Sequence, residues 1–338
     1  MNDILVVGAG FSGATIAHQL AEAGYNIHVI DKRDHLGGNA FDYINEYGIR
    51  IHKYGPHIFH TNNLKVVNYL KHFGDWAEYK HKVKCILNDG ELVTIPPNLE
   101  TAEKLGKENI VDVLFRPYTK KMWGLDLEQI DPKIIQRVAI RDDYNDLYFP
   151  NDKYQYMPKL GYTDIIKNML DHPKITIDLS TSFDIKQEQN YFHIFNSMPI
   201  DEYYNFKFGA LPYRSIKFYH MNLPIPKIQS LPTINFVNDG KYTRITEWKN
   251  YPFHGECIYN TSLTLEEPCC YRENNNERYY PVKDLNGMNR KRYEKYKSEK
   301  NDKVTFIGRC GLYVYIDMHQ AISSATAIAK QFEARLHV

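Results

Sequence analysis

The chain opens with an apolar–helical–apolar pattern. Residues 4–7 form a short continuous apolar run, as expected of a strand buried on both faces of a parallel sheet. Apolar positions then recur at helical spacing over residues 14–20, and a second buried-type run, residues 27–30, ends at Asp31. The pattern predicts a complete β-α-β unit.

Small elements follow this unit. Alternation over residues 79–95 around an Asn-Asp-Gly turn predicts a hairpin. Residues 99–123 are typical of two or three short helices, which we expect Pro117 to interrupt. The polar and aromatic stretch 126–158 is predicted to be irregular.

The second half of the chain is mainly β-like and then returns to the opening pattern. Its predicted elements are a helix at 162–170, strands at 175–177 and 304–307, β alternation over 214–280, a solvated helix in 288–303 and a helix at 317–332. The order predicts an α/β fold in which the chain leaves a nucleotide-binding domain and comes back to it.

Three parts are expected from this order. They are a Rossmann-like FAD-binding domain (residues 1–76, 160–208 and 300–338), a short helical domain (98–136, with a mobile loop after it) and an antiparallel β-sheet substrate domain (77–97, 137–159 and 209–299).

Composition excludes several classes of protein. Charged residues make up 25% of the 338 residues, and 42 Lys and Arg oppose 41 Asp and Glu. This balance argues against a nucleic-acid or membrane-surface binder. The five cysteines are odd in number and lack metal-ligand spacing, so we expect free thiols, no metal and a cytoplasmic location. No signal peptide is expected. The 27 tyrosines fit either core filling or the lining of a ligand cleft.

A glycine motif joins the first strand to the first helix. In Gly8-Ala9-Gly10-Phe11-Ser12-Gly13, the three glycines permit a tight turn, a close approach to a pyrophosphate and close packing of helix on strand. The helix N-terminus then faces the phosphates. Asp31 can accept from ribose hydroxyls and would repel the 2′-phosphate of NADP, so the motif predicts a bound dinucleotide.

FAD is favoured over NAD by what surrounds this motif. A second glycine pair, Gly37-Gly38, follows Asp31 and Lys32 and precedes Asn39, which suits a loop that passes the pyrophosphate and ring. Near the C-terminus Gly308-Arg309 can reach phosphate, and a helix beginning near Asp317-Met318 can face the carbonyl edge of the flavin.

Six further stretches resemble bacterial UDP-galactopyranose mutases, in the family's order and over nearly the whole chain. They are GGNA with HKYGPHIFHT in residues 33–61, YTKKMWG at 118–124, FGALPYRS at 208–215, YTRI at 242–245, YYPV at 279–282 and YIDMHQ at 315–320. The resemblance implies interconversion of UDP-galactopyranose and UDP-galactofuranose without net redox change, for surface-glycan synthesis. It also implies that N5 of reduced FAD attacks the anomeric carbon, while UDP leaves and returns.

The resemblance also implies roles for individual residues. Arg137 and Arg244 match the diphosphate ligands, and His57 matches a catalytic histidine that borders the flavin. His60 matches the sugar pocket, and His81 stands where typical members carry an asparagine that touches substrate. The remaining substrate-binding residues implied are Phe115, Tyr118, Trp123, Tyr148, Arg214, Tyr280 and Tyr315.

Alternatives stay open. The family's helical domain supplies much of a dimer interface, and because region 99–123 is short, a homodimer stays one possibility rather than an expectation. Changes near the sugar pocket leave a mutase for another nucleotide sugar, such as UDP-N-acetylgalactosamine or a dTDP-6-deoxyhexose. Other candidates are an amine-oxidase-type flavin oxidoreductase, a binding protein without activity and an NAD dehydrogenase.

Overall fold

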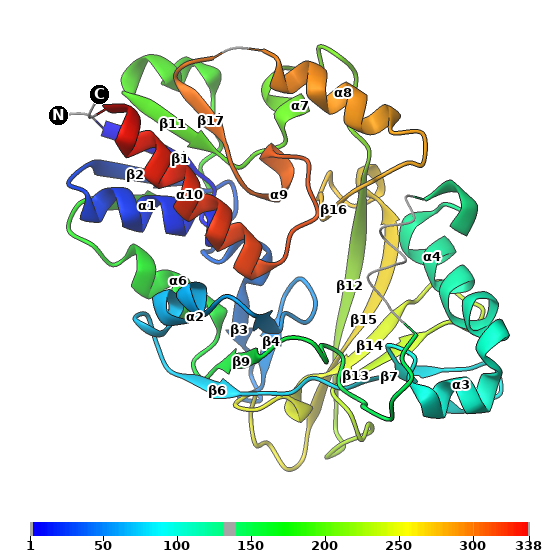
Figure 1. The fold of residues 1–338 in the computed structure, drawn as a ribbon. Helices are drawn as coiled ribbons and strands as arrows, with labels where there is room; N and C mark the ends of the chain where they lie inside the picture. The colour runs from blue at the N-terminus through cyan, green and yellow to red at the C-terminus, as the bar shows by residue number, and fades with distance from the viewer. Residues whose placement is uncertain (1–2, 131–139, 300, 337–338) are drawn as a thin grey trace.

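Two sheets of different character organise the molecule (Figure 1). The structure is a computed structural model that describes residues 3–130, 140–299 and 301–336. One sheet has five parallel strands, and the other has seven strands in a mixed arrangement. The expected α/β class, with a Rossmann-like part beside a β-sheet part, is confirmed. No helix in the described ranges is long and apolar enough to cross a membrane.

The five-stranded sheet has the strand order β10-β2-β1-β11-β17. Its strands are β1 (Asp3–Val7), β2 (Asn26–Ile30), β10 (Ile175–Asp178), β11 (His193–Asn196) and β17 (Val304–Phe306). The chain runs outward from β1 through β2 to β10 and then crosses back to β11 on the other side of β1. A sheet of this order opens a crevice at the carboxyl ends of β1 and β11, where the direction of winding reverses.

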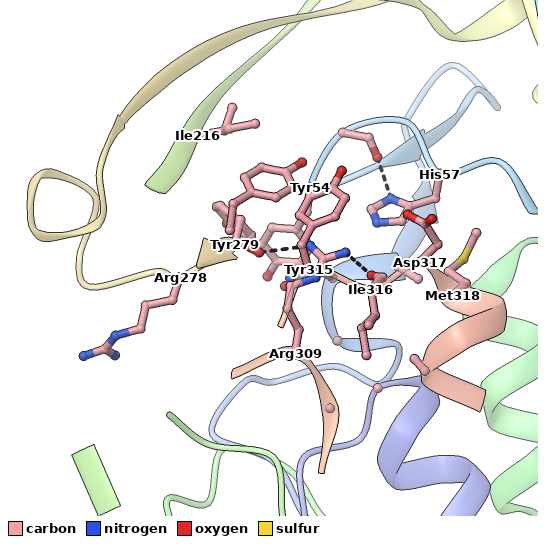
Figure 2. A pocket seen from close by; sticks show the side chains of 18 of the residues that line it. Tyr54, His57, Ile216, Arg278, Tyr279, Arg309, Tyr315, Ile316, Asp317 and Met318 are labelled. Atoms are coloured by element: carbon pink, nitrogen blue, oxygen red, sulfur yellow. Dashed lines mark hydrogen bonds between the residues drawn. The ribbon is translucent and has the colours of Figure 1, made fainter. Parts of the chain in front are cut away.

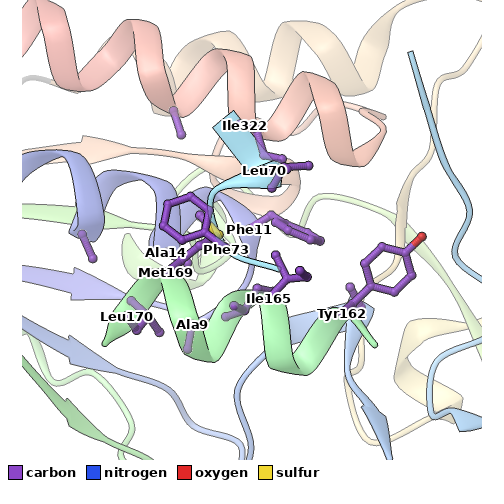
Figure 3. Packing of buried hydrophobic residues seen from close by; sticks show 14 of the residues in the cluster. Ala9, Phe11, Ala14, Leu70, Phe73, Tyr162, Ile165, Met169, Leu170 and Ile322 are labelled. Atoms are coloured by element: carbon purple, nitrogen blue, oxygen red, sulfur yellow. The ribbon is translucent and has the colours of Figure 1, made fainter. Parts of the chain in front are cut away.

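One helix, α1 (Phe11–Glu22), packs directly on the strands of this sheet. Three more helices pack around α1 with apolar faces: α2 (Leu64–Lys71), α6 (Tyr162–Leu170) and α10 (Met318–Leu336). Phe11 and Ala14 of α1 pack with Ile165 and Met169 of α6 and with Ile322 of α10 (Figure 3). Each large apolar side chain buried in this way contributes about 1.5–3 kcal/mol. This packing fixes the N-terminus of α1 at the crevice.

The seven-stranded sheet has the order β16-β12-β15-β14-β13-β7-β8. Its strands are β7 (Val83–Ile86), β8 (Leu92–Ile95), β12 (Tyr213–Leu223), β13 (Thr233–Phe236), β14 (Arg244–Glu247), β15 (Thr261–Cys270) and β16 (Tyr280–Pro281). The predicted hairpin is present as β7 and β8. The sheet is not wholly antiparallel, because β13 pairs with β7 in parallel.

Short helices stand beside this sheet, as expected for residues 99–123. They are α3 (Leu99–Leu105), the π-helical turn η3 (Val111–Phe115) and α4 (Arg116–Trp123). The expectation that Pro117 interrupts them is wrong. Pro117 lies in the first turn of α4, directly after the π-helical turn η3, and the helical path continues through it.

Two smaller sheets correct the expectation of an irregular segment. They pair β3 (Asp42–Ile44) with β4 (Arg50–His52), and β9 (Tyr154–Pro158) with β5 (Phe59–Thr61) and β6 (Trp76–Glu78). Within the stretch predicted to be irregular, β9 is therefore a strand. Its alternation was hidden because tyrosine and glutamine, not aliphatic residues, occupy most of its positions.

The last helices lie near the return of the chain to the five-stranded sheet. They are α7 (Ile200–Tyr203), α8 (Met288–Lys297) and α9 (Gly308–Gly311). The charged segment expected to be a solvated helix forms α8, yet Tyr293 and Tyr296 on it are buried. They pack with Leu211 and Tyr213, so α8 is anchored by one aromatic face.

Candidate active site

A cavity of about 890 Å³ lies between the crevice of the five-stranded sheet and the seven-stranded sheet. Its lining brings together nearly all the residues predicted for cofactor and substrate. From the cofactor set these are Gly8, Gly10, Phe11, Ser12, Gly13, Asp31, Lys32, Gly38, Asn39, His57, Arg309, Asp317 and Met318. From the substrate set they are His60, His81, Phe115, Tyr118, Trp123, Tyr148, Arg244, Tyr280 and Tyr315. Arg214 does not line the cavity, and Arg137 lies outside the described residues.

The crevice end is built from backbone. A Cβ added at Gly13 would lie 1.9 Å from the carbonyl oxygen of Gly8, so only glycine lets α1 approach β1 this closely. Gly8 has φ +105°, which an L side chain rarely adopts. Gly10 and Gly38 face each other, and a Cβ on Gly38 would lie 3.0 Å from the Cα of Gly10. The result is a glycine cradle at the N-terminus of α1, of the kind that binds a pyrophosphate.

Asp31 stands at the edge of this cradle and is buried. One carboxylate oxygen accepts from the backbone N–H of Ala9 at 2.7 Å, and the other accepts from the N–H of Arg33 at 2.9 Å. These bonds fix the side chain, and each oxygen keeps a lone pair for a ribose hydroxyl. The cradle and Asp31 therefore fit the adenosine diphosphate half of a dinucleotide such as FAD.

Arg309 occupies the centre of the cavity, with its guanidinium between aromatic rings (Figure 2). Its Nη1 donates to the carbonyl of Tyr279 at 2.9 Å, and its Nη2 donates to that of Ile316 at 2.7 Å. The guanidinium also lies 5.3 Å from the ring of Tyr280 and 5.1 Å from the ring of Tyr315. Arg309 thus ties β16 to the start of α10, and a contact to phosphate stays a prediction.

His57 lies in the loop between β4 and β5 and lines the same cavity (Figure 2). Its Nδ1–H donates to the carbonyl of Gly55 at 2.8 Å, so Nε2 is left as the acceptor. Burial lowers the pKa of His57 to about 4, with the nearby charges of Arg309 and Arg244 acting in the same direction. The ring is neutral at pH 7. His52 accepts from the backbone N–H of His57 and holds the loop.

Arg244 and Glu266 form a cross-strand pair on the seven-stranded sheet. They are register partners of β14 and β15, and Nη1 of Arg244 lies 3.5 Å from Oε1 of Glu266. Nε of Arg244 also donates to Asn235 on β13 at 3.2 Å. Burial opposes the charge of Arg244, yet Glu266 and nearby phenol groups raise its pKa well above the usual value. A permanent cation is therefore presented to the cavity, suited to a diphosphate.

Glu266 lines the cavity and is a functional candidate that no motif in the sequence singles out; Asn235 lies behind Arg244 and fixes its direction. Glu266 is 3% exposed, and burial raises the pKa of its carboxyl while Arg244 lowers it. A signal was present, because residue 266 falls on the same face of the strand as Ser262 and Thr264, both of which are buried. A charged residue at such a position requires a partner.

Aromatic side chains close the cavity near α4. Trp123 packs edge-on to Tyr280 with ring centroids 6.2 Å apart. Phe115 and Tyr118 line the same region, and burial raises the pKa of Tyr118 to about 12. Rings of this kind stack on a nucleobase and accept or donate through the phenol group. The arrangement can bind an aromatic base beside the Arg244 cation.

Two histidines lie on the far wall of the cavity. His60 donates from Nδ1 to Asp152 at 2.6 Å and stacks on Phe149, with centroids 3.6 Å apart. His81 is 3% exposed, shares a 2.9 Å hydrogen bond with the hydroxyl of Tyr79 and stacks on Phe149. Burial lowers the pKa of His81 to about 3, so the ring is neutral. In the described ranges no group of His, Cys, Asp and Glu side chains could hold a metal ion.

Arg214 has a different position from the one the resemblance implied. Its Nε donates to the carbonyl of Met122 at 2.8 Å, and its Nη2 donates to that of Lys121 at 3.0 Å. These carbonyls belong to the last turn of α4, where cations stabilise the free C=O groups. Arg214 thus holds α4 against β12, outside the cavity lining, and a contact to substrate stays a prediction.

Comparisons with known proteins agree with this arrangement. The family model of UDP-galactopyranose mutase matches residues 113–315, and the model of an NAD(P)-binding Rossmann-like domain matches residues 6–73. A probable UDP-galactopyranose mutase of Klebsiella pneumoniae is 35% identical and covers 98% of this chain and 94% of its own length. The dTDP-fucopyranose mutase of Escherichia coli is 31% identical, with 98% of both chains covered.

Solved structures share the fold. The crystal structure of a reduced UDP-galactopyranose mutase matches with a TM-score of 0.74 at 17% identity, over 99% of this chain and 94% of that chain. A putrescine oxidase matches with a TM-score of 0.61 at 13% identity, over 99% of each chain. The matched family model and the relatives at full length lead to one conclusion: the chain belongs to the UDP-galactopyranose mutase family, whose members are isomerases.

Proposed function

We propose that this chain is a flavin-dependent mutase that interconverts UDP-galactopyranose and UDP-galactofuranose in the cytoplasm, with reduced FAD as its cofactor. One observation carries the proposal. A single cavity runs from the glycine cradle to the Arg244–Glu266 pair, so a dinucleotide and an anionic nucleotide sugar can bind side by side. The name of the Klebsiella relative supports the choice of sugar.

FAD bound in its reduced form would supply the nucleophile, N5, for attack on the anomeric carbon. The chain's own residues then bind, orient and stabilise charge. Arg244 binds the diphosphate and stabilises the negative charge that develops as UDP leaves, with Arg137 as the second ligand expected from the resemblance. Trp123 and Tyr118 hold the base. His57, neutral and fixed through Gly55, presents an acceptor nitrogen to the cofactor site.

The test is a product assay with the reduced enzyme. Purified protein is treated with dithionite, incubated with UDP-galactofuranose, and analysed by HPLC for UDP-galactopyranose; the oxidised enzyme is the control. We expect turnover only after reduction, with no net consumption of reductant. The proposal fails if the reduced enzyme binds FAD yet forms no pyranose product.

A second candidate is a mutase for a dTDP-6-deoxyhexose. It is favoured by the Escherichia coli relative named dTDP-fucopyranose mutase, which is 31% identical over 98% of both chains. The same assay with dTDP-fucose and with UDP-N-acetylgalactosamine separates the candidates by the ratio of kcat/KM values. An amine-oxidase-type activity would instead consume oxygen in proportion to substrate, which an oxygen electrode measures.

A further inference from the structure

A strap of chain between β15 and β16, residues 271–279, crosses from the seven-stranded sheet to the crevice. We propose that this strap is a cofactor clasp, in which Glu277 pairs with Arg33 and Lys32 over the adenosine end of FAD and slows its release. The inference rests on the proposed binding of FAD. It assigns to Glu277 a positioning role that is separate from the chemistry of the sugar.

The first contact of the clasp joins the strap to the loop after β2. Oε2 of Glu277 lies 2.5 Å from Nη2 of Arg33, and Oε1 lies 3.8 Å from Nζ of Lys32. The side chains of Arg33 and Glu277 are 14% and 26% exposed, so water screens this pair only in part. Burial acts to raise the pKa of Glu277, but the two cations hold it below its usual value. The carboxylate is therefore charged at neutral pH.

Arg33 is held on its other sides as well. Its Nη1 donates to the side chain of Asn39 at 3.0 Å, and its guanidinium lies 4.2 Å from the centre of the ring of Tyr54. All these residues line the cavity, next to Asp31. Because Asp31 is the predicted ribose ligand, the Arg33–Glu277 pair stands beside the position expected for the adenosine.

The second contact joins the strap to the opposite lip of the crevice. Arg278 is directed away from Tyr279 and Arg309 (Figure 2), and its Nη1 lies 2.7 Å from Oε2 of Glu202 on α7. Helix α7 follows β11, whereas Arg33 follows β2. Glu277 therefore contacts the segment after β2, and Arg278 contacts the segment after β11. These segments lie on either side of β1, so the strap bridges the crevice.

The strap is fixed at both ends and lies over the cavity between them. Nδ2 of Asn274 donates to the hydroxyl of Ser215 at 2.9 Å and to the carbonyl of Ile216 at 3.0 Å. At the other end, the N–H of Tyr279 donates to the carbonyl of Arg214 at 3.1 Å. Between these anchors Asn276 lines the cavity. The clasp can therefore open by losing its ion pairs while both anchors stay in place.

The test compares Glu277→Gln with Glu273→Gln, a matched control. Glu273 lies in the same strap but is exposed and does not line the cavity. FAD release from each purified flavoprotein is followed by the rise in free-flavin fluorescence after dilution, at low salt and at 1 M NaCl. We expect Glu277→Gln to release FAD on the order of ten times faster than wild type, a change of about 1.4 kcal/mol in activation free energy. Glu273→Gln should stay within about twofold.

Salt gives a test that needs no variant. Raising the salt should speed FAD release from the wild type and from Glu273→Gln more than from Glu277→Gln, because only the first two keep the ion pair between Glu277 and Arg33. Release from Glu277→Gln at the wild-type rate, or the same salt response in all three, would overturn the clasp. The assay uses no sugar nucleotide: failure of the clasp leaves mutase turnover normal, whereas failure of the proposed function leaves FAD release unaffected.

Discussion

The two ends of the cavity differ in the groups that line them: backbone groups at the crevice end and side chains at the sheet end. At the crevice end, the glycine cradle and Asp31 come from one stretch of about thirty residues, and the binding groups are mostly backbone N–H. At the other end, Arg244, Glu266 and His81 come from separate segments and present their side chains to the cavity. The path of the backbone determines the shape of the crevice end, whereas the pairing of the strands determines which side chains meet at the sheet end.

This difference indicates how each end tolerates change. At Gly13 the cradle accepts no added atom, because the group that would move is the backbone carbonyl of Gly8. A side-chain site can be altered one residue at a time while the strands stay paired.

The largest effect is expected from Gly13→Ala. The new Cβ would lie 1.9 Å from the carbonyl oxygen of Gly8, so α1 must leave β1 and the cradle is lost. We expect no bound flavin and a fall of several kcal/mol in the free energy of unfolding, measured by flavin absorbance and denaturant titration.

Gly10→Ala separates binding from folding. Its Cβ would meet only ordinary contacts, 3.6 Å from the Cα of Gly38, although the methyl group would project into the cavity. This variant should fold with nearly wild-type stability and retain less flavin. Wild-type flavin content in Gly13→Ala would show that flavin binding does not depend on the close packing of α1 against β1.

A smaller effect is expected at the sheet end from Arg244→Ala. Loss of a charge-assisted contact to phosphate costs about 1.5–3 kcal/mol, which corresponds to roughly 10- to 150-fold in kcat/KM. The crevice is untouched, so flavin content should be that of the wild type. Arg244→Lys keeps the charge but loses the planar fork, and we expect it to recover only part of the rate. Steady-state kinetics of the reduced variants measure both; a rate for Arg244→Ala near that of the wild type would remove Arg244 from the site.

The crevice end could be predicted from the sequence because its determinants are local. The apolar runs of β1 and β2, the helical period of α1 and the three glycines all fall within one short segment. Each of these features predicts the β-α-β unit. Asp31 is the residue directly after the apolar run of β2, so its place at the end of that strand also follows from the sequence. Gly38 follows soon after β2, and the structure brings Arg309 to this unit from near the other end of the chain.

The sheet end could not be predicted in the same way. That Glu266 faces Arg244 depends on the register of β14 against β15, which no local pattern reveals. Arg214 resembled a substrate ligand by its motif, but its direction is set by the end of α4, about ninety residues away in sequence. The strand β9 was missed for a related reason, since its partners β5 and β6 lie far upstream.

The smallest effect concerns the response of the sheet end to acid. Burial lowers the pKa of His81 to about 3 in the folded protein, whereas an unfolded histidine titrates near pH 6.5. Between these values the unfolded chain binds the extra proton, so the free energy of unfolding falls as the pH falls below about 6.5. At pH 5.5 the loss from His81 is about 1.4 kcal/mol relative to neutral pH. Denaturant titrations of His81→Gln between pH 7.5 and 5.5 should show a correspondingly flatter profile, while the exposed control His72→Gln should follow the wild type. If the free energy of unfolding of His81→Gln fell with pH as steeply as that of the wild type, water would have to reach His81 more freely than its 3% exposure indicates.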